Sequence, residues 1–262
     1  MSDFIIQFGD RIAPGKIEGA LRERPWLQER PVHLTAFPWG QLILQEPPDS
    51  RYSPHTDMAG IVGCAGRPRY LNNSRKNQLS KDFCFNLARD WDDSIDLKAL
   101  LNNLTGMFSL LKVSAQKISI LTDHMGAQPV YCAYNAHGKL VGIGTDVEVL
   151  ALLSDRQQDF DPVSLGELLV HNNISFPFSS RNGITEFQPA SAINIEINDL
   201  TPSITETVLW VPQEPDSPEE GLVDELVDRM RATGSDIAQS VDSIGVTLSG
   251  GLDSRDRKST RL

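Results

Sequence analysis

The sequence lacks three features that would each indicate a particular class of protein. No apolar run approaches the ~20 residues that a membrane-spanning helix needs, and the formal net charge is -11. Nucleic-acid and anionic-membrane surfaces need clustered Lys and Arg, so we expect neither partner. Only three cysteines are present, and an odd number without a signal peptide favours a reducing compartment and no disulfide framework. The composition therefore predicts a soluble, cytoplasmic protein.

Spacings typical of metal or redox sites are also missing. The chain has no Cys-x-x-Cys pair, and its five histidines form no H-E-x-x-H or comparable group. Cys64, Cys84 and Cys132 each lie among apolar residues, where a free cysteine packs as a small hydrophobic side chain. No metal ligand is predicted, and redox chemistry is not expected.

The length of the chain and the positions of its turn-forming residues predict two domains. A chain of 262 residues with 40% hydrophobic and 23% charged residues can bury a sizeable core. Short alternating stretches separated by Gly, Pro, Asn and Asp fill residues 1–198, which we assign to a first, β-rich domain. Residues 199–218 are assigned to a linker, because their second half is rich in proline and acidic residues. Residues 219–254 then begin a second domain, and residues 255–262, which have no apolar stripe, are assigned to a non-native tail.

The second domain is predicted to begin with a helix and a strand. Ser217, Pro218 and Glu220 fit the cap, first and third positions of a helix that starts with a capping box. The apolar residues from Leu222 to Met230 fall on one face of that helix. Residues 244–248 are apolar and β-branched, which is typical of a buried parallel strand. We expect the helix face to pack on this strand.

The most informative motif is Ser249-Gly250-Gly251-Leu252-Asp253-Ser254, which follows the expected strand directly. Two residues without Cβ allow positive φ and a close approach of the backbone to a ligand. The next helix would begin at Asp253 and Ser254, and its free N–H groups and positive dipole end favour phosphate. The spacing is not that of a Walker A loop, since no lysine follows the glycines. An ordinary strand-to-helix Gly-Gly turn is the alternative interpretation.

This motif resembles the pyrophosphate-binding loop of the asparagine-synthetase-like ATP pyrophosphatases. Those enzymes bind ATP and release pyrophosphate while they adenylate a carboxylate. The resemblance implies ATP as cofactor, together with Mg²⁺ in the full-length parent enzyme. It implies that the ATP phosphates are contacted by Ser249, Gly250, Gly251, Asp253 and Ser254. It also implies that Leu248 lines the adenine side of the ATP site.

Upstream segments resemble the amino-terminal domain of asparagine synthetases and β-lactam-synthetase-like enzymes. The family pattern Asp-x-x-Gly-x-x-Pro-Leu-Tyr is matched by Asp123, Gly126, Pro129 and Tyr131. We expect Asp123 and Gly126 to shape this turn rather than to contact substrate. Further matching blocks extend the resemblance from about residue 104 to Ser254. They lie at Leu140–Leu153, with Thr145-Asp146 where Ser-Glu is commoner, at Asp159–Ala190, with Ala190 in place of a customary Gly, and at Trp210-Val211-Pro212.

The fold class that the resemblance implies is α+β. The first domain is expected to be an αββα sandwich of antiparallel sheets of the N-terminal-nucleophile-hydrolase type. The first helix and strand of an α/β ATP-pyrophosphatase domain should follow it.

The amino terminus departs from the glutamine-dependent members of this family, in which removal of Met exposes a nucleophilic cysteine. Ser2 follows Met1 here, and no clear Asn-Gly-Glu segment is found. Phe4–Phe8 is apolar and is predicted to be an ordinary strand. We therefore expect a degenerate glutaminase without a catalytic cysteine, in which Ser2 is a weak candidate nucleophile.

Three hypotheses for function follow. The first is an ATP-dependent amide-bond-forming ligase of the asparagine-synthetase type, present as an N-terminal fragment, that joins a small carboxylate or a peptide to ammonia or an amine. The second is a noncatalytic scaffold or interaction module, and the third is a glutaminase that uses Ser2. A homodimer is an assembly that the resemblance allows.

Overall fold

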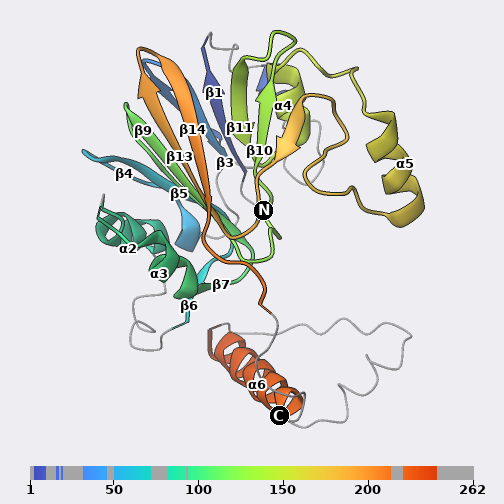
Figure 1. Ribbon diagram of the computed structural model, residues 1–262. Helices are drawn as coiled ribbons and strands as arrows, with labels where there is room; N and C mark the ends of the chain where they lie inside the picture. Colours follow the sequence, from blue (N-terminus) through green and yellow to red (C-terminus); the bar gives the residue numbers. More distant parts are fainter. Residues whose placement is uncertain are drawn as a thin grey trace. The chain divides into compact units, whose positions relative to one another are not determined.

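The structure is a computed structural model that describes residues 3–9, 16–17, 19, 32–45, 50–71, 82–92, 94–213 and 221–240 (Figure 1). The chain divides into two compact units, Met1–Val211 and Pro212–Leu262, which are described separately.

The first unit contains a sheet, here called sheet A, with the strand order β12-β10-β11-β1-β3-β2. Its strands are β1 (Phe4–Phe8), β2 (Val32–Phe37), β3 (Gly40–Gln45), β10 (Tyr131–Tyr134), β11 (Leu140–Gly144) and β12 (Ile184–Glu186). All pairings are antiparallel, and β1 lies at the centre between β3 and β11.

A second antiparallel sheet, sheet B, has the strand order β14-β13-β9-β8-β5-β4. Its strands are β4 (His55–Asp57), β5 (Gly60–Gly66), β8 (Phe108–Val113), β9 (Lys117–Thr122), β13 (Ser191–Asn198) and β14 (Thr201–Val208). A separate small pairing joins β6 (Arg69–Tyr70) to β7 (Leu104–Thr105).

Helices cover the outer faces of the two sheets (Figure 1). The helical segments are η1 (Ser50–Tyr52), α2 (Phe83–Asp90), α3 (Leu97–Asn102), α4 (Val147–Leu153), α5 (Pro162–His171) and, in the second unit, α6 (Leu222–Ser240). Residues of α2 and α3 pack on sheet B, and residues of α4 pack on sheet A. The layers therefore run helix, sheet, sheet, helix.

Side chains that point alternately to the two faces of each strand form the core between the sheets. In β1, Phe4, Ile6 and Phe8 join a cluster that also contains buried residues of sheet B, whereas Ile5 joins the cluster around α4. Successive side chains of a strand point to opposite faces, so a strand in a middle layer must be apolar on both. All five residues of β1 are buried.

The structure confirms several expectations from the sequence. The fold is mixed α+β with antiparallel sheets, and Phe4–Phe8 forms a strand as predicted. Helix α5 begins at the expected signal, with Asp161 as N-cap and Pro162 at the first helical position. The three cysteines are buried in the hydrophobic clusters, as expected from their apolar neighbours.

The first unit extends further than the sequence indicated. Residues 201–208, which we assigned to a linker, form strand β14, and β14 pairs with β13 along its whole length. Most residues of β14 are polar and exposed. The sequence of this strand therefore does not differ enough from that of a linker to predict a strand. The first unit therefore ends at Val211 rather than at residue 198.

Much of the expected second domain lies outside the described residues. This applies to the cap at Ser217–Glu220, the strand at 244–248, the Gly-Gly loop and the tail at 255–262. Helix α6 is described and contains the predicted apolar positions from Leu222 to Met230. Among the described helices, none combines the length and the apolar character needed to span a membrane.

We expect Ile6→Ala to lower the free energy of unfolding by about 2–5 kcal/mol, because it leaves a cavity between the sheets. Ile6 is 0% exposed in that core. Urea denaturation measures the change, and Met58→Ala, at a fully exposed turn position, serves as the control. A loss no larger than that of the control would contradict the assignment of β1 to the core.

Candidate functional site

The beginning of β1 is fixed on both sides by the ends of neighbouring strands. The backbone N–H of Gln45 donates to the Asp3 carbonyl at 2.9 Å, and the N–H of Thr145 donates to the Phe4 carbonyl at 3.1 Å. The Thr145 hydroxyl donates to Asp3 Oδ1 at 3.0 Å. An N-terminal nucleophile would have to precede this anchored position. Ser2 lies outside the described residues, so its role stays a prediction.

The Thr145-Asp146 pair links β1 to helix α4. Thr145 Oγ1 accepts from the N–H of Phe4 at 3.3 Å. Asp146 is the N-cap of α4, and its Oδ1 accepts from the N–H groups of Glu148 at 3.0 Å and Val149 at 3.1 Å. Threonine thus anchors the strand, and aspartate caps the helix.

Asp123 organises the turn between sheets B and A. Its Oδ1 accepts from the N–H groups of Met125 at 2.9 Å and Ala127 at 3.1 Å. Its Oδ2 accepts from the N–H groups of Phe108 and Gln128, each at 3.1 Å. The carboxylate is 2% exposed and is surrounded by these donors, which confirms that Asp123 shapes the turn.

Gly126 occupies the same turn with a φ of +62°. A Cβ at this position would lie 2.9 Å from Pro189 Cγ, and the left-handed backbone would strain most other residues. The turn ends at Pro129 and leads into β10 at Tyr131. The matching family residues therefore bring the chain from one sheet to the other.

A pocket of about 400 Å³ opens beside this turn. It lies among the turn, the start of β10, the end of β12, and the C-terminal end of α5 with the loop that follows it. Tyr131 and Glu186 are opposite each other in the β10–β12 pairing, and both line the pocket. We call this cavity the Glu186 pocket.

Glu186 is the ionisable acid of this pocket. Burial raises the pKa of its carboxyl to about 7, and no hydrogen bond or charged neighbour among the described residues offsets that effect. Burial, and secondarily the charge of Glu186, raise the pKa of Tyr131 to about 12. The phenol therefore stays neutral at physiological pH, while Glu186 titrates within that range.

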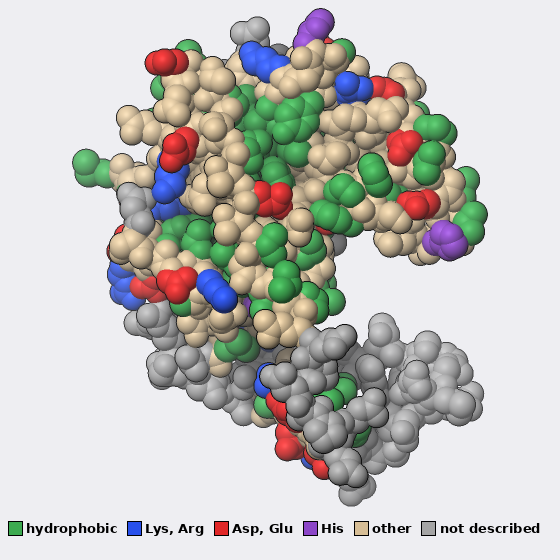
Figure 2. Space-filling view, viewed as in Figure 1, with side chains coloured by type: hydrophobic (Ala, Val, Ile, Leu, Met, Phe, Trp, Pro, Cys, Tyr) green, Lys and Arg blue, Asp and Glu red, His purple; other side chains and the backbone are tan. Residues whose placement is uncertain are grey.

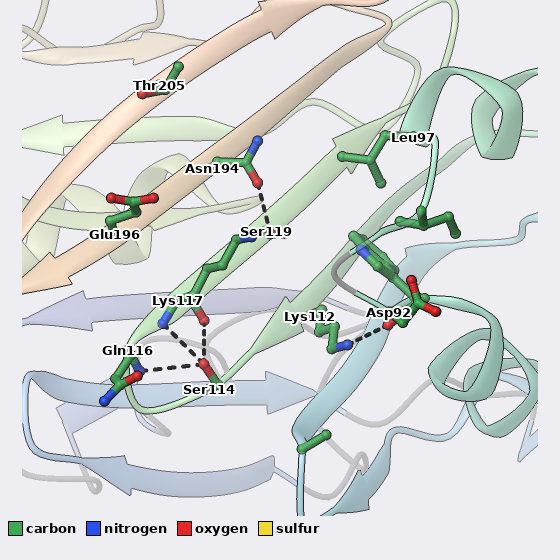
Figure 3. A pocket seen from close by; sticks show the side chains of 13 residues that line it. Asp92, Leu97, Lys112, Ser114, Gln116, Lys117, Ser119, Asn194, Glu196 and Thr205 are labelled. Carbon is green, nitrogen blue, oxygen red and sulfur yellow. Dashed lines mark hydrogen bonds between the residues drawn. The ribbon is translucent and has the colours of Figure 1, made fainter.

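A second pocket, of about 730 Å³, lies on the outer face of sheet B (Figure 3). It adjoins the hairpin at the start of β9, whereas the Glu186 pocket adjoins the turn at the end of β9. Lys112 Nζ donates to the Trp91 carbonyl, and Ser119 Oγ donates to Asn194 Oδ1 at 2.9 Å. The lining mixes lysines with carboxylates, and its polar groups bind one another, which is typical of a solvated sheet face.

Residues 96–206 match the family model of the glutamine amidotransferase domain. The matched segment runs from the start of α3 to within β14, and it contains both the Asp123 turn and the Glu186 pocket. It begins after β1, β3 and β5, so the N-terminal region that holds the nucleophile in glutamine-dependent relatives is not part of the match.

Two solved structures have a fold similar to that of this chain. One is the glutamine phosphoribosylpyrophosphate amidotransferase from B. subtilis complexed with ADP and GMP, and another is described as the allosteric regulatory enzyme of purine biosynthesis. Each is 12% identical with a TM-score of 0.51, and each alignment covers 81% of this chain and 50% of the other chain. The chain thus spans about half the length of these proteins. No curated protein shows significant sequence similarity.

These comparisons confirm the coarser part of the expected resemblance. Residues 96–206 match a glutamine amidotransferase domain model, and the fold is similar to that of the solved amidotransferase. The asparagine-synthetase-like assignment and the ATP-pyrophosphatase part stay predictions. The ATP-contact residues Leu248, Ser249, Gly250, Gly251, Asp253 and Ser254 lie outside the described residues.

Glu186 was missed by reasoning from sequence. It lies in a segment that resembles the family only in its glycine, isoleucine and proline positions, and nothing in its immediate neighbours indicates burial. The enclosure comes from α5 and its following loop, which are distant along the chain. For the described residues, no group of three or more His, Cys, Asp or Glu side chains is arranged to hold a metal ion.

We expect Asp123→Asn to lower the free energy of unfolding by about 3 kcal/mol, because an amide group would face backbone donors that a carboxylate now satisfies. Thermal or urea unfolding measures the loss. Asp92→Asn is the matched control, since exposed Asp92 also accepts from an N–H two residues later, that of Ser94 at 2.8 Å. Equal losses in the two variants would refute the special role of the Asp123 turn.

Glu186→Gln should stabilise the protein at pH 8 but not at pH 5. The folded-state pKa is about 7 against an ordinary value of 4.5, so the folded state binds more protons between these values and wild-type stability falls as pH rises. Because the side chain is half-buried, we expect a gain of only about 1 kcal/mol at pH 8. Unfolding at both pH values tests this, with exposed Glu196→Gln as control; a gain independent of pH would contradict the raised pKa.

Proposed function

We propose that this chain carries the amidotransferase-type domain and the ATP-binding loop of an asparagine-synthetase-like ligase that forms amide bonds. The observation that carries the proposal is the sequence order. The Ser249–Ser254 motif follows a glutamine-amidotransferase-type domain in the same chain. Either feature alone is compatible with other functions, whereas their succession matches the two-part organisation of such ligases.

The proposed reaction has two steps. A substrate carboxylate oxygen attacks the α-phosphorus of ATP, which gives an acyl-adenylate and releases pyrophosphate. The nitrogen of ammonia or of an amine then attacks the acyl carbon, AMP leaves, and the nitrogen loses a proton to give the amide. The first step requires a site that holds pyrophosphate.

The residues of the Gly-Gly loop fit pyrophosphate by their chemistry. Gly250 and Gly251 supply backbone N–H groups without a Cβ that would keep the ligand away. Ser249 and Ser254 supply hydroxyl donors, Asp253 begins the expected helix, and Leu248 is proposed to lie beside the adenine. Mg²⁺ would neutralise phosphate charge in the full-length enzyme. Because the loop lies outside the described residues, these roles depend on its sequence.

The nitrogen source proposed for this ligase is free ammonia or an amine. The sequence has Ser2 in place of the cysteine found in glutamine-dependent relatives. The next residue, Asp3, uses its carboxylate to accept a hydrogen bond from Thr145. The start of β1 therefore keeps a structural role that needs no glutamine hydrolysis.

Adenylation is tested by exchange of labelled pyrophosphate into ATP, with a panel of carboxylates that includes L-aspartate. We expect exchange by the full-length gene product to depend on the carboxylate and on Mg²⁺. Gly250→Val should lower it at least tenfold, because the side chain blocks approach of the backbone to phosphate, whereas Asp92→Asn should leave it unchanged. Absence of exchange with every carboxylate would sink the ligase proposal and favour a noncatalytic module.

The nitrogen source is tested by supplying glutamine or ammonium chloride to the same protein. We expect ammonium to support product formation and glutamine to be left intact, as measured by glutamate release. Ser2→Ala should change neither result. Glutamine hydrolysis that disappears in Ser2→Ala would overturn this part of the proposal and identify Ser2 as the nucleophile.

A further inference from the structure

The Glu186 pocket has the size of a small-molecule site. Its volume of about 400 Å³ is within the range of pockets that bind small organic ligands. All described residues that line the pocket belong to the first unit. Its role can therefore be considered without reference to ATP or to the proposed ligase reaction.

The walls of the Glu186 pocket combine an apolar surface with one acid. Tyr131, Leu168 and Phe178 contribute aromatic and aliphatic surface, while Asn173 and Ser180 contribute neutral polar groups. Lysine, arginine and histidine are absent from its described lining. Glu186 is thus the one charged side chain in the part of the lining that the structure describes.

The position of Glu186 is fixed by its backbone. Its N–H donates to the Pro177 carbonyl at 2.8 Å, and the residue pairs with Tyr131 across the two strands. The Glu186 carboxylate is not among the partners of any hydrogen bond or ion pair in the described residues, and burial alone accounts for its raised pKa. A half-buried carboxylate without a partner costs free energy that a bound cation would recover.

We propose that the Glu186 pocket binds a small organic cation that carries a primary ammonium group on an apolar or aromatic body. The ammonium group pairs with the Glu186 carboxylate. The rings of Tyr131 and Phe178 provide faces that attract a cation and apolar surface for the rest of the molecule. Asn173 and Ser180 offer further hydrogen bonds.

The surroundings of the pocket favour a ligand with an apolar part. Several large hydrophobic side chains of α5 and the following loop are exposed, namely Leu168, Leu169, Val170, Phe176 and Phe178. Figure 2 shows hydrophobic side chains over this part of the surface, in the region of α5 in Figure 1. An apolar body that leaves the pocket would thus meet apolar side chains, with an acidic side chain of α5 among them.

Binding of such a cation should strengthen as pH rises. Of the groups that face Glu186, Tyr131 on β10 stays neutral because its pKa is raised to about 12. In the turn after β9, the Asp123 carboxylate is bound to backbone N–H groups. The titratable residues Glu167 and His171 of α5 do not line the pocket. With a pKa of about 7, the ionised fraction of Glu186 rises from about one tenth at pH 6 to about nine tenths at pH 8.

Isothermal titration calorimetry with 2-phenylethylamine, on the full chain, tests the proposal. This amine stays protonated at both pH values, so we expect its Kd to be about tenfold lower at pH 8 than at pH 6. The neutral 2-phenylethanol, which has the same body, should bind at least tenfold more weakly at pH 8. Equal binding of the two probes, or no binding of the amine at millimolar concentration, would overturn the proposal.

Variants separate this site from nonspecific attraction to an acidic protein. Glu186→Gln should lower amine affinity at least tenfold at pH 8 and abolish the pH dependence, and Phe178→Ala should lower it about threefold. Glu196→Gln, which removes the same charge from exposed β13, should bind as wild type. Glu186→Asp is a second variant that keeps the charge and should retain part of the affinity. Wild-type affinity in a folded Glu186→Gln protein would refute the role of Glu186.

Discussion

Burial of β1 on both faces is the constraint on which the rest of the first unit depends. Phe4, Ile6 and Phe8 pack into the core between the sheets, and Ile5 packs toward α4. Without sheet B on one face or α4 on the other, apolar side chains of this central strand would be exposed. The two sheets and α4 must therefore assemble around β1. The beginning of β1 is fixed as a consequence. This requirement is structural.

The Asp123 turn extends this constraint from one sheet to the other. The chain leaves sheet B at the end of β9, passes through the turn, and enters sheet A at β10. Four N–H groups bound to one buried carboxylate hold the turn in a single conformation. The position of Tyr131, and therefore of the Glu186 pocket, follows from that turn. The Asp123 turn, which connects the two sheets, thus also positions a wall of the pocket.

Local signals in the sequence predicted the elements that depend on local chemistry. The helix after Asp161 was found because an N-cap and a proline are short-range features, and the strand at Phe4–Phe8 was found from its apolar run. Strand β14 was missed because its identity depends on pairing with β13, and its exposed residues resemble those of a linker. The Glu186 pocket was missed for a related reason. Its lining comes from the turn, two strands and α5, and no spacing along the chain indicates that these segments meet.

Two charged residues five positions apart show why Glu186 differs from a structural buried charge. Arg181 is 7% exposed, yet its guanidinium pairs with Glu148 at 2.5 Å, donates to the Gln157 carbonyl, and lies 3.7 Å from the centre of the Phe160 ring. Its charge is therefore compensated within the fold. Among the described residues, Glu186 has no comparable partner. A fold that compensates one buried charge so fully and leaves its neighbour uncompensated gains no stability from the second charge. A cationic ligand of the Glu186 pocket would supply the partner that the described residues do not.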